Sequence, residues 1–284
     1  MKMIFSIITV VLNDAEGLLV TADSVIKQTS KNFEWVVVDG GSSDDTLTGI
    51  KQLESVSPIL HSSKDNGIYD AMNKGVELST GQYLLFMNAG DSFADESVLD
   101  DLERFIKDNN SIDVILGGTF RKIKKCVFYS PPRNIRWIVS GLPAFHQSTI
   151  YKSDLMRSQK YNLDYTLLAD YEWLAKQCVS GLTVGYLNRP VSNYIIGGVS
   201  YTNLKKKFND LFSVKHEVLG CSRVRAGISS CQAILKTIFV MQVLYRCCGL
   251  CQFRQSSYPS ESSYTYTIKD KLEFYKYKEA DDNV

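Results

Sequence analysis

The chain has 284 residues, 44% of them hydrophobic, which is enough for one large domain or two small ones around a substantial core. Its 32 basic and 31 acidic residues nearly cancel, and the net charge of +1 gives no electrostatic reason to expect nucleic acid as a partner. Seven cysteines without a framework spacing argue against a disulfide scaffold and fit reduced thiols in the cytoplasm.

Apolar, β-branched runs alternate with segments of helical spacing through the first 120 residues. The runs that predict strands are 3–12, 33–39, 58–63, 81–91 and 112–120. The segments that predict helices are 18–28, 45–55, 67–78 and 96–109. Such alternation predicts an α/β fold with a mainly parallel sheet flanked by helices.

The pattern is less regular after residue 120. Residues 166–181 indicate a helix that Gly181 would end, and 190–203 indicate a strand followed by a glycine loop. Residues 205–253 look helical, and the chain from 255 on is expected to be weakly ordered. Because no segment offers 18 uncharged apolar residues, a membrane-spanning helix is not expected.

Polar residues stand at the carboxyl ends of three of the predicted strands: Asn13-Asp14, Asp39 to Gly41, and Asn88 to Asp91. In parallel sheets the ligand lies beyond the carboxyl ends of the strands, so these loops are the candidate site. Asp39 could be a turn or helix-capping acid, or a carboxylate that contacts a base or ribose while the glycines after it let the backbone approach. The absence of a G-x-G-x-x-G motif after these strands disfavours a dinucleotide cofactor.

Three further residues have both an ordinary and a chemical interpretation. Asp91 could be a turn acid or a ligand of Mg²⁺ or Mn²⁺, ions that often take one or two protein carboxylates plus phosphate and water. Asp170 could be an acid favoured by the helix dipole or a general base. His146 could be a core histidine or a contact of phosphate or acceptor. Spacing alone does not choose a reaction.

Taken together, a series of motifs resembles the family 2 glycosyltransferases, and within them the bacterial members that build colanic acid and O-antigen. The motifs run in order from about residue 3 to 204: SIITVVLND, WVVVDGGSSDDT, KDNGIYDAMNKG, GQYLLFMNAGD, LPAFHQSTIY, LLADYEW and GGVSYTN. DNGIYDAMNKG followed by LLFMNAGD and then HQ is the most specific part of the resemblance.

The resemblance implies a GT-A fold and an inverting, metal-dependent transfer from a nucleotide sugar, usually a UDP-sugar. It implies that Asp170 is the catalytic base and that Asp91 holds Mn²⁺ or Mg²⁺. The residues that it places at the substrates are Val10, Asn13, Asp39, Asp65, Gly67, Tyr69, Asp70, Asn73, Lys74, Asn88, Ala89, Gly90, His146, Gln147, Gly197, Gly198 and Ser200.

Three positions, in two motifs, depart from the family pattern. Asn88 and Gly90 stand where many relatives have acids, so the D-x-D motif keeps only its last acid, Asp91. Leu12 replaces an aromatic residue that often packs near the uracil. The processive Q-x-x-R-W motif is missing, which predicts one sugar per acceptor.

The chain can also be divided into regions, and the resemblance implies an acceptor and a place in the cell. Residues 1–204 would be the GT-A domain, with a donor half at 1–120 and an acceptor half at 121–204. Residues 205–254 would be a helical extension that packs or lies on a membrane surface, and 255–284 a tail. The implied acceptor is a lipid-diphosphate-linked saccharide on the cytoplasmic face of the plasma membrane, with the protein peripheral to it.

Two other functions compete with this one. A sugar nucleotidyltransferase would need a glycine-rich loop with basic residues after the first strand, and VVLNDAEGLL has neither. A non-catalytic partner in a polysaccharide assembly complex would fit the reduced D-x-D motif but not the retained Asp91 and Asp170.

Overall fold

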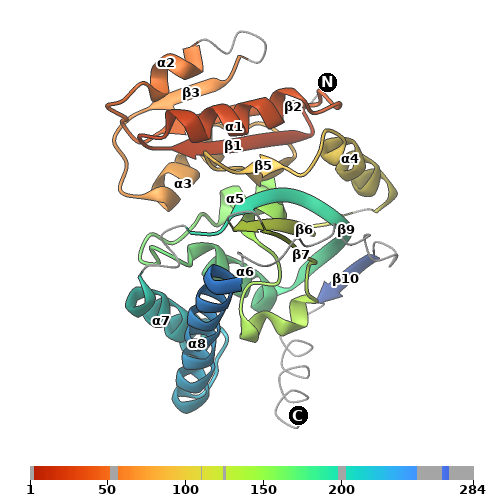
Figure 1. Cartoon of the computed structure of the whole chain (residues 1–284). Helices are drawn as coiled ribbons and strands as arrows, with labels where there is room; N and C mark the ends of the chain where they lie inside the picture. Colours follow the sequence, from red (N-terminus) through yellow and green to blue (C-terminus); the bar gives the residue numbers. More distant parts are fainter. Residues whose placement is uncertain are drawn as a thin grey trace.

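The computed structural model describes residues 3–51, 57–109, 111–123, 126–197, 203–247 and 264–268. Within these ranges the chain folds around one mixed sheet with helices on both faces (Figure 1). Six strands, β1, β2, β3, β4, β6 and β9, point in the same direction. The predicted α/β class is confirmed.

The sheet has the order β10-β9-β6-β8-β4-β1-β2-β3, with β5 paired to β9 and β7 paired to β6. The strands are β1 (Phe5–Val11), β2 (Phe33–Asp39), β3 (Ile59–Ser62), β4 (Tyr83–Phe86), β5 (Ser92–Phe93), β6 (Val114–Ile123), β7 (Cys126–Ser130), β8 (Thr149–Lys152), β9 (Leu182–Ile195) and β10 (Tyr264–Ile268). In the parallel half Val11 pairs with Asp39 and Asp39 with Ser62, so these strands end at one edge.

Strand β9 begins eight residues before the strand predicted at 190. Gly185 and Pro190 look like strand breakers in the sequence, but each has a place in the sheet. A Cβ at Gly185 would lie 2.6 Å from the Phe105 ring, so glycine lets a helix approach the strand. Pro190 pairs with Gly118, where the β6–β9 register shifts as in a bulge.

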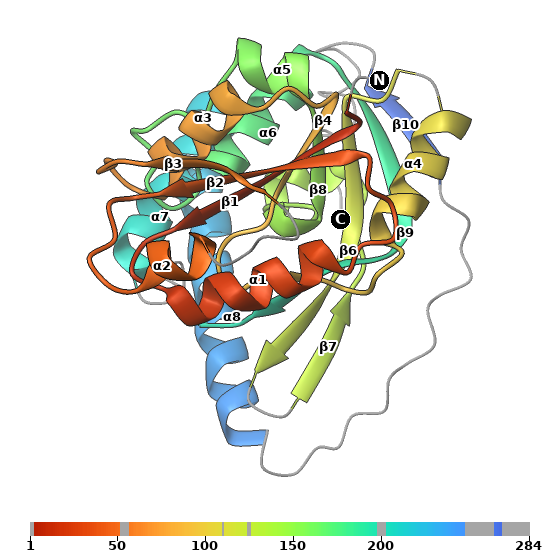
Figure 2. The same ribbon diagram turned by 90° about the horizontal axis from the view of Figure 1, so that it is seen from above.

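Helices cover both faces of the sheet (Figure 2). Alternate residues of β1 divide between two cores: Phe5 and Ile7 pack with α1 and α4, whereas Ile8 and Val10 pack with α3 and α6. The helices are α1 (Ala15–Ile26), α2 (Thr46–Lys51), α3 (Ile68–Leu78), α4 (Val98–Asp108), α5 (Ser153–Ser158), α6 (Ala169–Ser180), α7 (Leu204–Ser213) and α8 (Arg223–Cys247), with short turns η1 (Ile135–Ser140) and η2 (His146–Ser148).

The C-terminal part adds a helical layer. Helix α7 continues into the π-helical turn η4 (Val214–Val218), the chain turns at Gly220, and α8 packs back on α7. Strand β10 pairs with β9, which differs from the weak order expected after residue 255; the rest of that tail lies outside the described residues. Among the described residues no helix is long and apolar enough to cross a membrane.

Candidate functional site

The loop after β2 is organised by Asp39. Its buried carboxylate accepts hydrogen bonds from the amides of Gly41 and Ser42, at 3.1 Å, and from Ser62 Oγ at 2.6 Å. Burial acts to raise the pKa of Asp39, but these hydrogen bonds outweigh it, and the pKa lies below its usual value. Asp39 is therefore ionised and fixes the carboxyl end of β2 against that of β3.

The loops after β1 and β2 are joined by Asn13. This residue has a φ of 51°; its amide donates to Ser42 Oγ at 2.7 Å, and its Oδ1 accepts from the Ser43 amide at 2.8 Å. The Val10 side chain is buried in the core, so contact with a base would fall to the exposed Leu12 and to Asn13 at the end of that segment.

Gly40 brings the loop before α3 against the loop after β2. A Cβ at Gly40 would lie 2.4 Å from Asp65 Oδ2 and 3.4 Å from a methyl of Leu12. Only glycine leaves this space open. Leu12, Gly40 and Asp65 therefore lie together in the structure, although 53 residues separate the first from the last.

Thr21 of α1 anchors the loop from Asn88 to Asp91 by hydrogen bonds to its backbone. Thr21 Oγ1 lies 3.0 Å from the Asn88 carbonyl and 2.7 Å from the Asp91 carbonyl, and it accepts the Gly90 amide at 3.1 Å. Gly90 has a φ of +90°, a conformation that favours glycine. The Ala89 amide donates to the Val10 carbonyl at 3.2 Å. Sequence reasoning missed Thr21, because nothing local marks a threonine inside a helix as a loop anchor.

Asp91 and Asn88 meet the pair His146-Gln147. Gln147 Nε2 donates to Asp91 Oδ2 at 2.9 Å, and Asn88 Nδ2 lies 3.2 Å from His146 Nε2. Burial raises the pKa of Asp91 to about 7, although the bond from Gln147 acts to lower it. Burial lowers the pKa of His146 to about 4, so its ring is neutral at pH 7 and Nε2 accepts from the Asn88 amide.

The donor set around Asp91 fits a hard divalent cation. The Asn88 Oδ1 and Gln147 Oε1 atoms are buried and have no hydrogen-bond partner, and the Asp91 carboxyl has a raised pKa. Mn²⁺ and Mg²⁺ take oxygen ligands, and buried oxygens without partners are costly unless something satisfies them. Among the described residues no group of three His, Cys, Asp or Glu converges, so diphosphate and water would complete the coordination.

Asp170 lies in the first turn of α6 and is buried. Its Oδ1 accepts the Tyr69 hydroxyl at 3.0 Å and the Tyr171 amide at 2.9 Å. Burial raises the pKa of Asp170 to about 6, while those two bonds act to lower it. Both bonds reach the same oxygen, so within the described part of the chain Oδ2 is the oxygen left for another donor.

The segment 65–74 makes contacts of its own. The Asp65 carboxylate accepts the Gly67 amide, and Asp70 accepts the Asn66 amide, each at 2.9 Å. Asn73 exchanges two hydrogen bonds of 2.9 Å with the backbone of Tyr161. Lys74 donates to the Lys64 carbonyl and lies 3.3 Å from the Asp70 carboxylate. Contacts of these residues with a substrate stay predictions.

The predicted donor-side loop after β9 is described only in part. Gly197 has a φ of +143°, and a Cβ there would meet nothing within 4 Å. Gly198 and Ser200 lie outside the described residues. Contact between this loop and the donor therefore stays a prediction.

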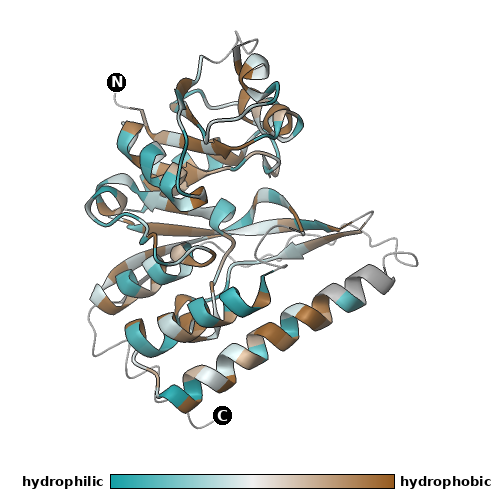
Figure 3. Cartoon of the chain, turned by 90° about the vertical axis from the view of Figure 1, so that its left-hand side faces the viewer, coloured by the Kyte–Doolittle hydropathy of each residue, from teal (hydrophilic) through white to brown (hydrophobic). Residues whose placement is uncertain are grey.

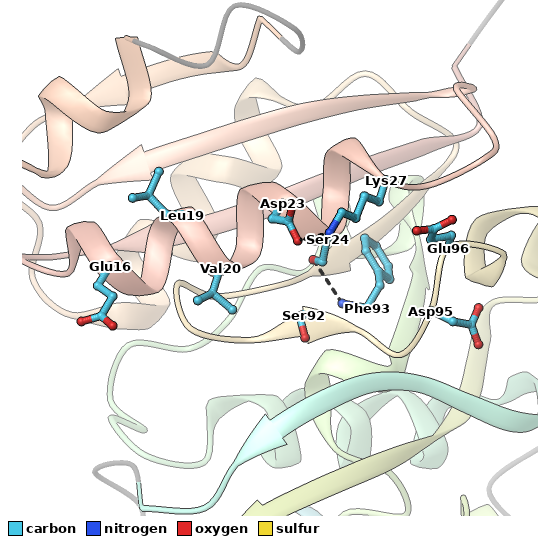
Figure 4. Close-up of a pocket in the computed structure, with 10 residues that line it drawn as sticks. All are labelled: Glu16, Leu19, Val20, Asp23, Ser24, Lys27, Ser92, Phe93, Asp95 and Glu96. Atoms are coloured by element: carbon cyan, nitrogen blue, oxygen red, sulfur yellow. Dashed lines mark hydrogen bonds and ion pairs between the residues drawn. The ribbon is translucent and has the colours of Figure 1, made fainter.

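A hollow of about 510 Å³ lies between α1 and β5 (Figure 4). Ser24 Oγ accepts the Phe93 amide there at 3.2 Å and ties β5 to α1. The lining residues are Glu16, Leu19, Val20, Asp23, Ser24, Lys27, Ser92, Phe93, Asp95 and Glu96. None of them is a predicted site residue, so we assign this hollow no part in the chemistry.

Comparison with known proteins gives a family and several relatives. The model of the family described as "Glycosyl transferase family 2" matches residues 6–167. A "PGL/p-HBAD biosynthesis glycosyltransferase" of Mycobacterium bovis (strain BCG / Pasteur 1173P2) is 34% identical over 220 residues, which cover 72% of this chain and 82% of that protein. The "Amylovoran biosynthesis glycosyltransferase AmsB" of Erwinia amylovora is 24% identical, over 67% of this chain and 69% of that protein.

Solved structures agree in fold. TarS of S. aureus, residues 1–349 in complex with UDP-GlcNAc, has a TM-score of 0.62 at 18% identity and covers 85% of this chain and 75% of that one. The mannosyltransferase PcManGT of Pyrobaculum calidifontis, in complex with GDP-Man and Mn²⁺, has a TM-score of 0.59 at 12% identity, with 88% and 76% covered.

Proposed function

Because the chain belongs to glycosyl transferase family 2, we propose that it moves one sugar from a UDP-sugar to a lipid-linked saccharide acceptor, with inversion at the anomeric carbon. The UDP part is supported by TarS, which was solved with UDP-GlcNAc. A part in glycoconjugate or polysaccharide biosynthesis is supported by relatives named for PGL/p-HBAD and amylovoran biosynthesis, and the lipid-linked acceptor is our own inference within that role. A surface polysaccharide such as O-antigen, capsule or colanic acid would be the product, made on the cytoplasmic face of the membrane.

The environment of Asp170 is the observation that carries the proposal. A general base works best when its pKa lies near the working pH, and burial raises the pKa of Asp170 to about 6. Tyr69 and the Tyr171 amide hold Oδ1, so the carboxylate has one fixed orientation. Oδ2 then takes the proton of the acceptor hydroxyl as the acceptor oxygen bonds to the anomeric carbon and the diphosphate leaves.

Asp91 is proposed to act on the other product of that displacement, the leaving diphosphate. With the oxygens of Asn88 and Gln147 it would hold Mn²⁺ or Mg²⁺. A bound divalent cation supplies positive charge that stabilises the leaving group. Thr21 and Gln147 keep the loop and the carboxylate in place. Because the His146 ring is neutral at pH 7, it adds no positive charge beside these ligands.

The donor nucleotide is proposed to lie between the loops after β1, β2 and β3. Leu12 and Asn13 would face the base, Asp39 the ribose or uracil, and Asp65 the ribose or diphosphate. Asp39 already accepts from two amides of its own loop and from Ser62 at the end of β3, so it would contribute mainly by fixing the backbone amides of Gly41 and Ser42.

Calorimetric titration of the purified chain with UDP and with GDP, each with Mn²⁺ and with EDTA, tests the donor site. We expect UDP to bind only with Mn²⁺. If neither nucleotide binds to the folded protein, the non-catalytic alternative is favoured.

Two variants separate the roles of the acids. Asp91→Ala should lose Mn²⁺-dependent UDP binding and transfer together. Asp170→Asn should keep UDP binding and lose transfer by about 10²-fold or more, the usual contribution of a general base. Near-normal transfer by Asp170→Asn would remove Asp170 as the base.

A further inference from the structure

Helix α8 exposes a line of apolar side chains. Val224, Ile228, Leu235 and Phe239 are 72%, 56%, 65% and 65% exposed. Their spacing of four, seven and four residues puts them on one side of a helix. These four residues are called the α8 stripe. Figure 3 shows α8 as a long helix at the margin of the molecule with hydrophobic segments along it.

The opposite side of α8 is the one that packs on the protein. Ala226 and Ser230 are buried, and Lys215 Nζ donates to Ser229 Oγ at 2.8 Å. Lys207 of α7 donates to Thr237 Oγ1 at 3.3 Å. A helix packed on one side is usually polar on the other, so the α8 stripe is not explained by the described fold.

Trp137 extends the apolar surface beyond α8. A hollow of about 520 Å³ separates η1 from α8, with Trp137 and Val139 on one wall and Val224 and Ile228 on the other. Trp137 is 41% exposed, and the Arg136 guanidinium lies 5.8 Å from its ring centroid. Tryptophan beside a cation is typical of side chains at the water–lipid boundary.

The same layer concentrates positive charge. Residues 203–247 contain eight Lys or Arg and two acids, a net charge of +6 in a chain whose total is +1. No acidic residue occurs between 218 and 247. Lys205, Lys206, Arg223 and Lys236 are exposed. One of the two acids, Asp210, is buried and accepts the Leu167 amide.

We propose that the α8 stripe, with Trp137, docks on an anionic lipid surface. An apolar helix side flanked by cations is what such surfaces bind, through apolar burial and attraction to acidic headgroups. A second copy of the chain is disfavoured because an isologous contact would bring together two copies of a layer whose exposed charges include Lys205, Lys206, Arg223 and Lys236. Residues 248–284 carry five basic and six acidic residues, too balanced to select this face by charge.

Docking there would set the orientation of the acceptor side of the site. Asp210 of α7 accepts the Leu167 amide, and the Leu167 carbonyl oxygen lies 3.0 Å from the Tyr69 hydroxyl that donates to Asp170. The layer that carries the α8 stripe is thus bonded to the residues that hold the base. This consequence rests on the proposed function, whereas the docking itself does not.

Co-sedimentation of the full chain with vesicles tests the docking. Neutral phosphatidylcholine vesicles are compared with vesicles that contain about 30% phosphatidylglycerol, at about 0.1 M and 0.5 M salt. We expect binding to the anionic vesicles that weakens with salt and little binding to the neutral ones. The double variant Leu235→Ser/Phe239→Ser should lose at least about tenfold in vesicle affinity.

A matched control comes from α1, where Leu19 and Val20 are 49% and 47% exposed. Leu19→Ser/Val20→Ser removes the same kind of surface away from the α8 stripe and should bind vesicles like the wild type. UDP binding with Mn²⁺, measured on the same proteins, should be equal in all three. The vesicle assay contains no sugar, so failure of the proposed function would leave its result intact.

Several outcomes would overturn docking. Absence of binding to anionic vesicles is one, and equal losses in the α8 and α1 variants are another. A lipid-free dimer that Leu235→Ser/Phe239→Ser dissociates in sedimentation velocity would assign the stripe to self-association. If the wild type binds no vesicles and Leu235→Ser/Phe239→Ser is much less stable than the wild type in urea, the α8 stripe would instead pack against another segment of this chain.

Discussion

The hydroxyl of Tyr69 should control the pH at which the enzyme becomes active. It donates to Asp170 Oδ1 at 3.0 Å, and it is the first of the groups that act against burial to lower the pKa of Asp170 from a still higher value. Tyr69→Phe removes that bond and leaves the ring in place. The pKa of Asp170 should therefore rise above about 6, and a higher pH should be needed to ionise the base.

The size of the shift follows from the bond that is lost. A hydrogen bond to a charged group contributes about 1.5–3 kcal/mol, which corresponds to about 1–2 pKa units. At about pH 6 half of the wild-type base is ionised, so kcat/KM of the variant should fall about 5- to 50-fold. At about pH 9 the base is ionised in both proteins, and their kcat/KM values should be similar.

The assay is UDP release as a function of pH, with the donor and acceptor identified by the binding screen. Tyr165→Phe is the matched control, because its hydroxyl lies 2.8 Å from Ser213 Oγ and does not contact Asp170. An unchanged midpoint in Tyr69→Phe, or an equal shift in Tyr165→Phe, would refute the assignment of Asp170 as a base tuned by Tyr69. A uniform loss at all pH values would indicate a structural role for the ring.

Three further changes test the donor side. Asp91→Asn should abolish the stabilisation of the folded protein by Mn²⁺. In EDTA the variant should be more stable than the wild type above about pH 7, because a carboxyl whose pKa is raised in the folded state destabilises the wild-type protein as pH rises through that pKa. Urea unfolding at several pH values would measure both effects. Thr21→Val should weaken Mn²⁺-dependent UDP binding about tenfold by freeing the loop that it anchors, with calorimetry as the measurement. Gly40→Ala should displace the Asp65 carboxylate and weaken UDP binding in the same titration, while the melting temperature changes little.

The strands and their polar ends could be predicted from the sequence because the signals are local. β-branched runs such as 3–12 are long enough to identify buried strands, and a glycine next to an acid marks the end of β2 at Asp39 and the loop after β4 at Asp91. The order of the motifs was sufficient for the family. Strand β9 begins eight residues before the predicted start at 190, and the places of Gly185 and Pro190 in it depend on partners on α4 and β6 that lie far away in the sequence.

The chemistry of the site depends on partners that are far apart in the chain. Gln147 reaches Asp91 across 56 residues, and Tyr69 reaches Asp170 across 101. The raised pKa values of both acids come mainly from burial, which only packing creates. No periodicity in the sequence encodes such pairings, so the fold alone assigned these residues to each other.

The C-terminal layer shows the same division. The sequence determined that residues 205–247 are largely helical, apolar and basic, because helix propensity and charge belong to the residues themselves. Which side of α8 faces outward was decided by its packing on α7, because both sides carry apolar residues and periodicity cannot choose between them. Likewise, Thr21 became the anchor of the Asp91 loop only when α1 was laid against the sheet.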